Sequence, residues 1–346
     1  MSESDEPGGP ELAKPPVAVM GAGSWGTTFA MVLADAGVPV RLWARRASVA
    51  QAINADHENP DYLPGLALPE RVWASSDARE VLTGAAEVVL AVPSQSLRAN
   101  LTGWTPWLGP DASLVSLMKG VELGTHLRMS EVIAAAGQVS DDRVVVISGP
   151  NLAGEIARRQ PTATVVACLD HDRAERVAAM CSTAYFRPYT ETDVVGVEVG
   201  GAVKNVIALA VGMAEGLGFG QNTQASLITR GLAETARLAA ALGAHPATLS
   251  GLAGMGDLVA TCASPLSRNR TFGVRLGEGM TLAEVEAVTS QTAEGVKSCQ
   301  PVVDLAEAYG VDVPIARAVV AVVHEQMPPQ EMVRILLSRA LKHERT

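Results

Sequence analysis

The chain has 346 residues, 48% of them hydrophobic, and a formal net charge of -10 at pH 7. This length favours two domains with sizeable cores, and the acidic balance excludes a broad basic surface for nucleic acid. The four cysteines and six scattered histidines lack zinc-binding spacings, so we expect reduced thiols, a cytoplasmic location and no metal.

The first 16 residues are acidic and proline-rich, unlike the basic start of a secretory signal. We expect them to form a disordered tail. The apolar run at 201–214 contains Lys204 and is followed by Glu215. This pattern indicates a segment too short and too charged for stable membrane insertion.

A glycine-rich turn follows the first strand-like run, at 17–20. A helical segment at 27–36 and a second strand at 38–43 come next. This order is typical of a dinucleotide-binding unit, so we predict NAD or NADP as cofactor. The predicted contacts are the residues of the turn: Gly21, Gly23, Ser24, Trp25 and Gly26. The alternative is a purely structural turn.

Two arginines, Arg45 and Arg46, follow the second strand. NAD-selective proteins of this type usually carry an acid there, which accepts hydrogen bonds from the ribose. Guanidinium groups suit a 2′-phosphate instead, so the pair favours NADP(H). The alternative is a pair of solvated surface arginines.

Further strands are predicted at 87–94, 113–118, 143–148, 164–168 and 184–188. Lys119 and the turn at 149–155 come directly after two of them. Ligands of parallel sheets bind beyond the carboxyl ends of the strands. Both features are therefore candidates for the ligand site, although Lys119 could also be a surface lysine.

Helical periodicity replaces the strands after about residue 190. We predict an α/β protein in which a Rossmann-type doubly wound sheet (17–193) precedes an all-α C-terminal domain (194–346). The predicted helices are 198–217, 222–242, 295–309, 314–326 and 329–342.

Lys204 lies in the most apolar of these helices, near its predicted start. A lysine in a desolvated cleft can exchange a proton near neutral pH, which predicts a catalytic base facing the domain boundary. The alternative is a lysine whose ammonium group reaches solvent from the helix start.

Two further segments suit ligand binding. Ser267 is a plausible N-cap for a helix that opens with Arg268 and Asn269, and such a helix start binds anions well. Glu294 also precedes a helix, where it could accept a hydrogen bond from the cofactor or cap the helix. Each segment also has a purely structural interpretation as a capped surface helix.

These motifs occur in order and together resemble the bacterial NAD(P)-dependent glycerol-3-phosphate dehydrogenases over nearly all of 17–340. The segments that carry the resemblance are GAGSWG at 21–26, Lys119-Gly120, Gly149-Pro150, GAVKN at 201–205, GMGDL at 254–258 and SRNR at 267–270. The blocks around Lys204 and Ser267 are specific to that family, whereas the glycine turn alone is not.

The resemblance implies a homodimer that reversibly oxidises sn-glycerol 3-phosphate to dihydroxyacetone phosphate. The reverse reaction supplies glycerol 3-phosphate for phospholipid synthesis. It implies that Lys204 accepts the proton, with Lys119 and Asp257 also catalytic. The implied cofactor contacts are Ser24, Trp25, Arg45, Lys119, Ala153, Arg268, Thr292 and Glu294. The implied substrate contacts are Lys119, Gly149, Asn151, Lys204, Asp257, Ser267, Arg268 and Asn269. Asn151 and Thr292 depart from the Ser or Thr and the Val that are more usual at these positions.

Two alternatives remain open from the sequence. A dehydrogenase of the same plan could act on a 3-hydroxy acid, because a carboxylate also suits the basic site. A cofactor-sensing regulator without turnover is also possible, but the presence of Lys119, Lys204 and Asp257 argues against it.

Overall fold

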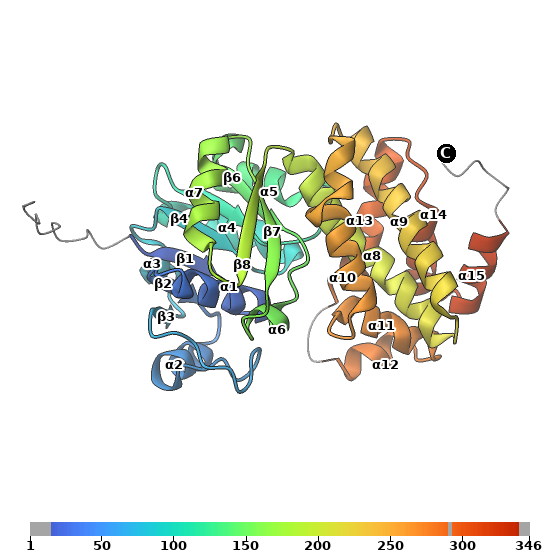
Figure 1. The fold of residues 1–346 in the computed structure, drawn as a ribbon, viewed down its shortest axis with the longest axis horizontal. Coiled ribbons are helices and arrows are strands. Elements are labelled where there is room, and N and C mark those ends of the chain that lie inside the picture. Colours follow the sequence, from blue (N-terminus) through green and yellow to red (C-terminus); the bar gives the residue numbers. More distant parts are fainter. Residues whose placement is uncertain (1–14, 290–292, 339–346) are drawn as a thin grey trace, which may run out of the picture.

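The computed structural model describes residues 15–289 and 293–338. The predicted tail lies almost entirely outside this range, as does Thr292. Figure 1 shows two bodies side by side, a sheet flanked by helices and a bundle of helices. The predicted order of an α/β part followed by an all-α part is confirmed.

The sheet has eight strands in the order β3-β2-β1-β4-β5-β6-β7-β8. All neighbours are parallel except β6 and β7, so the doubly wound Rossmann-type prediction is confirmed. The strands are β1 (Val17–Met20), β2 (Val40–Trp43), β3 (Val72–Ser75), β4 (Glu87–Leu90), β5 (Ser113–Ser116), β6 (Val144–Ser148), β7 (Thr162–Ala167) and β8 (Phe186–Glu191).

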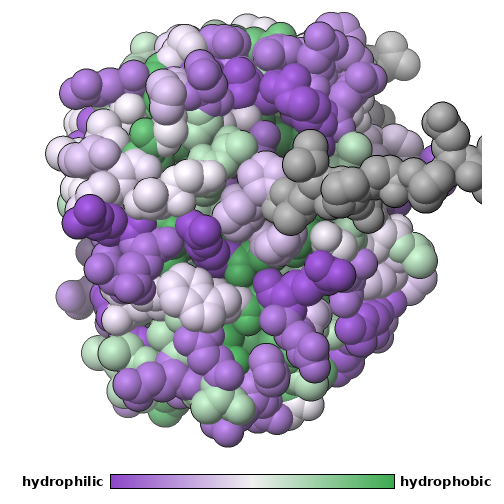
Figure 2. All heavy atoms as spheres, turned by 90° about the vertical axis from the view of Figure 1, so that its left-hand side faces the viewer, coloured by the Kyte–Doolittle hydropathy of each residue, from purple (hydrophilic) through white to green (hydrophobic). Residues whose placement is uncertain are grey.

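Helices cover both faces of the sheet, and each face has its own apolar core. One core includes α1, α2 and α7, and the other includes α3, α4 and α5. The end of this domain that is turned away from the bundle exposes mainly hydrophilic residues (Figure 2). The helices are α1 (Ser24–Asp35), α2 (Ala47–Asp56), α3 (Ala78–Leu82), α4 (Leu97–Trp104), α5 (Met129–Gly137), α6 (Ala153–Ile156) and α7 (His171–Cys181).

Strand β3 was not predicted. It is a four-residue edge strand with a short apolar run, Val72 to Ala74. One of its faces is solvated, and Trp73 is 43% exposed. The observed β7 and β8 are displaced by about two residues from the predicted ranges. Strand ends are poorly marked where one face of an edge strand is solvated.

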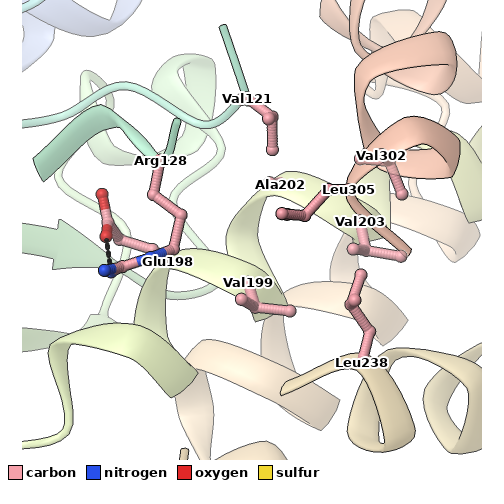
Figure 3. Close-up of a pocket in the computed structure, with 10 residues that line it drawn as sticks. Val121, Arg128, Glu198, Val199, Ala202, Val203, Leu238, Val302 and Leu305 are labelled. Atoms are coloured by element: carbon pink, nitrogen blue, oxygen red, sulfur yellow. Dashed lines mark hydrogen bonds and ion pairs between the residues drawn. The ribbon is translucent and has the colours of Figure 1, made fainter. Parts of the chain in front are cut away.

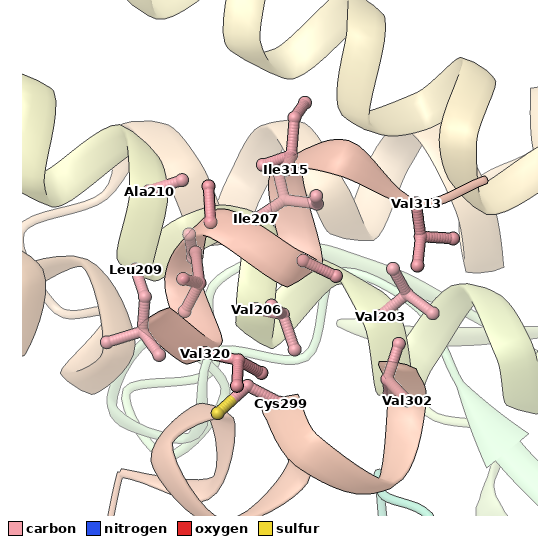
Figure 4. Close-up of a cluster of buried hydrophobic side chains, with 14 of the residues drawn as sticks. Val203, Val206, Ile207, Leu209, Ala210, Cys299, Val302, Val313, Ile315 and Val320 are labelled. Carbon is pink, nitrogen blue, oxygen red and sulfur yellow. The ribbon is translucent and has the colours of Figure 1, made fainter. Parts of the chain in front are cut away.

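Helix α8 (Val194–Gly216) lies at the centre of the second body. The helices around it are α9 (Gln221–Ala241), α10 (Asp257–Ala263), α11 (Arg268–Gly277), α12 (Leu282–Ala287), α13 (Glu294–Ala308), α14 (Pro314–His324) and α15 (Pro329–Leu337). Figure 4 shows Val203, Val206 and Ile207 of α8 packed among side chains of α13 and α14. The helix is apolar on all sides because other helices surround it.

Two predictions about α8 are wrong. The helix begins at Val194, capped by Asp193, so Lys204 lies near the middle of its 23 residues rather than at its start. Its length and composition are also sufficient to cross a membrane, but 94% of the apolar window is buried inside the protein. Internal packing therefore accounts for its apolar character.

Helices α8 and α11 pack with their backbones in contact. A Cβ atom at Gly273 would lie 2.3 Å from the carbonyl oxygen of Leu209, and one at Gly212 would lie 2.1 Å from that of Arg270. Gly216 and Gly277 extend the same contact by one turn. No side chain larger than hydrogen fits at these crossing points.

We predict that Gly273→Ala lowers the free energy of unfolding by about 1–3 kcal/mol, because the methyl group forces the helices apart. Gly103→Ala is the matched control. Gly103 is an exposed residue of α4, and a Cβ atom there would meet nothing within 4 Å, so this change should stabilise the chain by about 0.4–1 kcal/mol. Urea denaturation followed by circular dichroism measures both, and an unchanged Gly273→Ala midpoint would contradict the direct contact.

Candidate functional site

Lys119, Lys204 and Asp257 meet where the two bodies join. Lys204 Nζ donates to Asp257 Oδ1 at 2.5 Å, and Lys119 Nζ donates to Oδ2 of the same carboxylate at 2.5 Å. Lys119 follows β5, whereas Lys204 and Asp257 belong to α8 and α10. One buried carboxylate therefore holds two ammonium groups that come from different domains.

Glycine residues let the three segments that carry these side chains approach one another. A Cβ atom at Gly201 would lie 2.6 Å from Ser148 Oγ and 3.5 Å from Lys119 Cγ. A Cβ atom at Gly200 would lie 2.6 Å from the carbonyl oxygen of Ala253, in the π-helical turn Leu252–Gly256 that precedes Asp257. Such turns recur at functional sites because they redirect the next residue.

The ammonium group of Lys204 does not reach solvent. Only 7% of the residue is exposed, and Nζ donates a second hydrogen bond to Thr261 Oγ1 at 2.7 Å. The solvent-reaching alternative is therefore wrong. Thr261 was missed from the sequence, although its position four residues after Asp257 places both side chains on one face of α10.

Burial changes the acidity of Lys119. Its Nζ also donates to the carbonyl oxygen of Gly149 at 3.0 Å, so the group is enclosed by protein. Desolvation lowers the pKa of Lys119 to about 7; the Lys204 charge adds to this effect and Asp257 opposes it. Lys119 therefore changes protonation state near neutral pH.

The glycine turn has the geometry that a dinucleotide needs. Gly21 has φ +132° and lies against Ala91, while a Cβ atom at Gly26 would lie 1.9 Å from the carbonyl oxygen of Gly21. A Cβ atom at Gly23, by contrast, would meet nothing within 4 Å. The backbone is closely packed at Gly21 and Gly26, whereas the space beside Gly23 is open. The turn therefore fits a pyrophosphate at the start of α1. The buried Nε1 of Trp25 has no partner within the described ranges.

The two arginines lie beside this turn. The Gly21 amide donates to the carbonyl oxygen of Trp43 at 3.2 Å, which places the end of β2 next to the turn. Arg45 and Arg46 follow and are exposed. Arg46 forms an ion pair with Asp61 at 2.5 Å, a pairing that the sequence did not indicate.

The residues of the predicted anion site lie at the start of α11. Ser267 Oγ accepts from the Arg270 amide at 3.3 Å, so the N-cap prediction is confirmed. The Arg268 side chain can be reached by solvent, yet the protein around it lowers its pKa by desolvation, and Glu294 opposes this shift. A guanidinium group at a helix N-terminus suits a phosphate.

Asn269 is largely committed to other protein groups. Its Nδ2 donates to Asn205 Oδ1 at 2.9 Å, and its Oδ1 accepts from the Gly295 amide at 2.9 Å. One amide hydrogen remains for a ligand. Asn269 thus fixes α8, α11 and α13 relative to one another, a role that the sequence did not reveal.

Glu294 connects the bundle to the turn after β4. Ser94 Oγ donates to Glu294 Oε2 at 2.9 Å, and burial raises the pKa of the Glu294 carboxyl. Ser298, one turn further along α13, is fully buried, and its Oγ has no partner within the described ranges. The sequence analysis missed both serines: the partner of Ser94 is distant in the chain, and nothing in the local sequence marks Ser298.

The 149–153 turn lies on the other side of Lys119. Gly149 has φ +146°, which favours glycine. Asn151 Nδ2 donates to Thr164 Oγ1 at 2.9 Å, whereas its Oδ1 has no partner in the part of the chain that the structure describes. The carbonyl oxygen of Ala153 accepts from Thr28 Oγ1 on α1 at 3.3 Å. The turn therefore lies between the lysine pair and the start of α1.

A second pairing joins the domains behind the site. Glu198 of α8 accepts from Arg128 at 2.6 Å and from the Ser130 amide at 2.7 Å (Figure 3). The adjoining cavity has a volume of about 10 Å³, enough for about one water molecule. This region is a structural joint rather than a substrate pocket. No cluster of potential metal ligands occurs within 15–289 and 293–338.

The whole chain has well-defined relatives. Family profiles described as NAD-dependent glycerol-3-phosphate dehydrogenase N-terminus and C-terminus match residues 16–174 and 193–334. A Streptomyces griseus protein named glycerol-3-phosphate dehydrogenase (NAD(P)+) is 65% identical over 328 residues, which are 95% of this chain and 98% of that protein. A Thermobifida fusca protein of the same name is 60% identical over 330 residues, with 95% and 98% coverage.

A solved structure supports the same relationship. The crystal structure of a glycerol-3-phosphate dehydrogenase from Coxiella burnetii has a TM-score of 0.90 and 38% sequence identity, and the match covers 94% of this chain and 99% of that one. Sequence profiles, relatives and fold agree over both domains. This chain therefore belongs to the NAD-dependent glycerol-3-phosphate dehydrogenase family.

Proposed function

We propose that the protein interconverts sn-glycerol 3-phosphate and dihydroxyacetone phosphate with NAD(P)(H), and that it supplies glycerol 3-phosphate for phospholipid synthesis. The observation that carries the proposal is the pair of lysines on one buried carboxylate, between an open glycine turn and a basic helix start. Its relatives carry the corresponding enzyme name.

Lys204 accepts the proton of the substrate hydroxyl. Bound NAD(P)+ would supply the acceptor for the hydride that leaves the carbon bearing this hydroxyl. The side chains of Asp257 and Thr261 fix Lys204 Nζ in one place, which is the positioning that general base catalysis requires. Lys119 lies on the other carboxylate oxygen and lines both the cofactor and the substrate site.

The start of α11 holds the phosphate group. Arg268 supplies charge, Ser267 caps the helix start that would face the phosphate, and Asn269 contributes its remaining amide hydrogen. Gly149 and Asn151 line the opposite side. Binding energy from the phosphate, which does not react, orients the carbon that does.

The glycine turn would hold the cofactor. Ser24, Trp25, Ala153 and Arg268 would contact it, and Glu294 would lie at its nicotinamide end. Arg45 and Arg46 lie where a 2′-phosphate would extend, which favours NADP(H). Thr292, which belongs to the same set, lies outside the described residues.

We also propose how the chain is organised. A boundary at 193/194 between a cofactor domain and a substrate domain is supported by the end of β8 at Glu191 and the start of α8 at Val194. The four free, buried cysteines suit a reducing cytoplasm. The homodimer rests on family resemblance, and the acidic charge argues against nucleic acid as a partner.

We predict that glycerol 3-phosphate with NADP raises the absorbance at 340 nm, and that glycerol and 3-hydroxy acids do so far more slowly.

Arg268→Ala should raise KM for glycerol 3-phosphate at least about tenfold, the effect of losing about 1.4 kcal/mol of a charged hydrogen bond. Arg275→Ala, on the same helix but bonded to Thr289, is the control. Comparable turnover of glycerol would refute the phosphate site, and cofactor binding without turnover would favour a regulator.

A second prediction concerns the proton acceptor. Lys204→Met should bind NADPH normally but lower kcat by at least about 100-fold, because the base is lost while Lys119 still neutralises Asp257. Lys297→Met makes the same change at an exposed lysine and should leave kcat near the parent value. Near-parent turnover of folded Lys204→Met would remove the base assignment.

A third prediction concerns pH. Lys119 is protonated below about pH 7 and neutral above it. A neutral Lys119 no longer opposes proton uptake by Lys204, so kcat/KM for oxidation should rise as pH increases through 7. Arginine keeps its proton at these pH values, so Lys119→Arg should remove this rise whatever its absolute activity. If Lys119→Arg retained an ionisation near pH 7 in the same initial-rate profile, Lys119 could not be the titrating group.

A further inference from the structure

The loop between α2 and β3 is fixed against the glycine turn. Asn59 is completely buried, and its Nδ2 donates to the carbonyl oxygen of Ala22 at 3.0 Å and to Thr27 Oγ1 at 2.8 Å. Three residues later, the carbonyl oxygen of Tyr62 accepts from Ser24 Oγ at 3.4 Å. The loop is thus bonded on both sides of Asp61 to the residues that would hold the cofactor.

These hydrogen bonds hold Asp61 next to the glycine turn, on the side where the 2′ position of a bound cofactor would lie. Its carboxylate pairs with Arg46 at 2.5 Å, with 43% and 52% of the two side chains exposed. Arg46 follows β2, whose last residue, Trp43, accepts from the Gly21 amide. The ion pair therefore lies beside the turn and within reach of solvent and ligand.

We propose that Asp61 is a specificity-determining residue that sets the balance between NADP(H) and NAD(H). This inference rests on the cofactor placement of the proposed function. When the ribose carries a 2′-hydroxyl, Asp61 remains the counter-ion of Arg46. When it carries a 2′-phosphate, the phosphate replaces Asp61 as the partner of Arg46, and the two anions repel each other.

Asp61 and the 2′-phosphate compete for Arg46 alone; Arg45 does not take part in this competition. Among the described residues, Arg45 forms no ion pair, so its charge is available to either cofactor. Arg46 is available to a 2′-phosphate only when the phosphate displaces the carboxylate. The pair is exposed, and exposed pairs are weak, so Asp61 moderates the preference without abolishing binding of either cofactor.

The test compares cofactor affinities, measured by fluorescence titration with NADPH and NADH. Asp61→Asn should tighten NADPH about two- to fivefold, the range for an exposed ion pair, and change NADH by less than that. The shift in the ratio of the two dissociation constants should shrink in 0.5 M salt, because salt screens exposed charges.

Asp56→Asn is the matched control. It removes the same charge from an exposed residue at the other end of α2, about 15 Å along the helix from Arg46, and should leave the ratio unchanged. In an Arg46→Ala background, Asp61→Asn should shift the ratio less, because the competition for Arg46 is gone and only the direct repulsion between Asp61 and the phosphate remains.

Two results would overturn the proposal: an unchanged ratio of the two dissociation constants, or an equally large shift of that ratio in the Arg46→Ala background. Neither of these depends on turnover. A protein that binds both cofactors but does not oxidise glycerol 3-phosphate would contradict the proposed function, and its binding ratio would still test Asp61.

Discussion

The carboxylate of Asp257 is the interaction on which the site depends. It is 1% exposed and accepts from both Lys119 and Lys204, which come from different domains. Two buried ammonium groups side by side would repel each other and lose their hydration without it. Removing one partner of a buried ion pair typically costs about 3–5 kcal/mol, and here two cations would lose their partner. The domain junction and the chemistry therefore share one group.

Close backbone packing makes this arrangement possible. Gly200 and Gly201 bring α8 against the π-helical turn and the end of the sheet, so the lysines reach Asp257 without strain. Gly212 and Gly273 then lock α8 to α11. The groups proposed to hold the phosphate and to move the proton thus lie on two helices that cannot slide past each other, a rigid support of the kind that precise positioning needs.

The sequence predicted features that depend on local pattern. The glycine turn, the inner strands, the N-cap at Ser267 and the central apolar helix were recognised because their residues are close in the chain. The contacts that were missed join distant positions: Ser94 to Glu294 across 200 residues, and Lys204 to Thr261 across 57. The start of α8 was misjudged although its capping bond is local, from the Gly196 amide to Asp193 Oδ1. Edge strand β3 was missed because its apolar run is only three residues long, Val72 to Ala74.

The burial of α8 has a consequence for synthesis of the chain. Its bundle neighbours, which include α11, α13 and α14, all follow it in the sequence, so it leaves the ribosome before these helices can cover it. At about 5–20 residues per second, this interval lasts for seconds. During it, the nascent chain carries a helix long and apolar enough to enter a bilayer. A lysine at the centre of such a helix disfavours insertion by about 2.5–3.5 kcal/mol, so Lys204 also helps to keep the unfinished chain out of membranes.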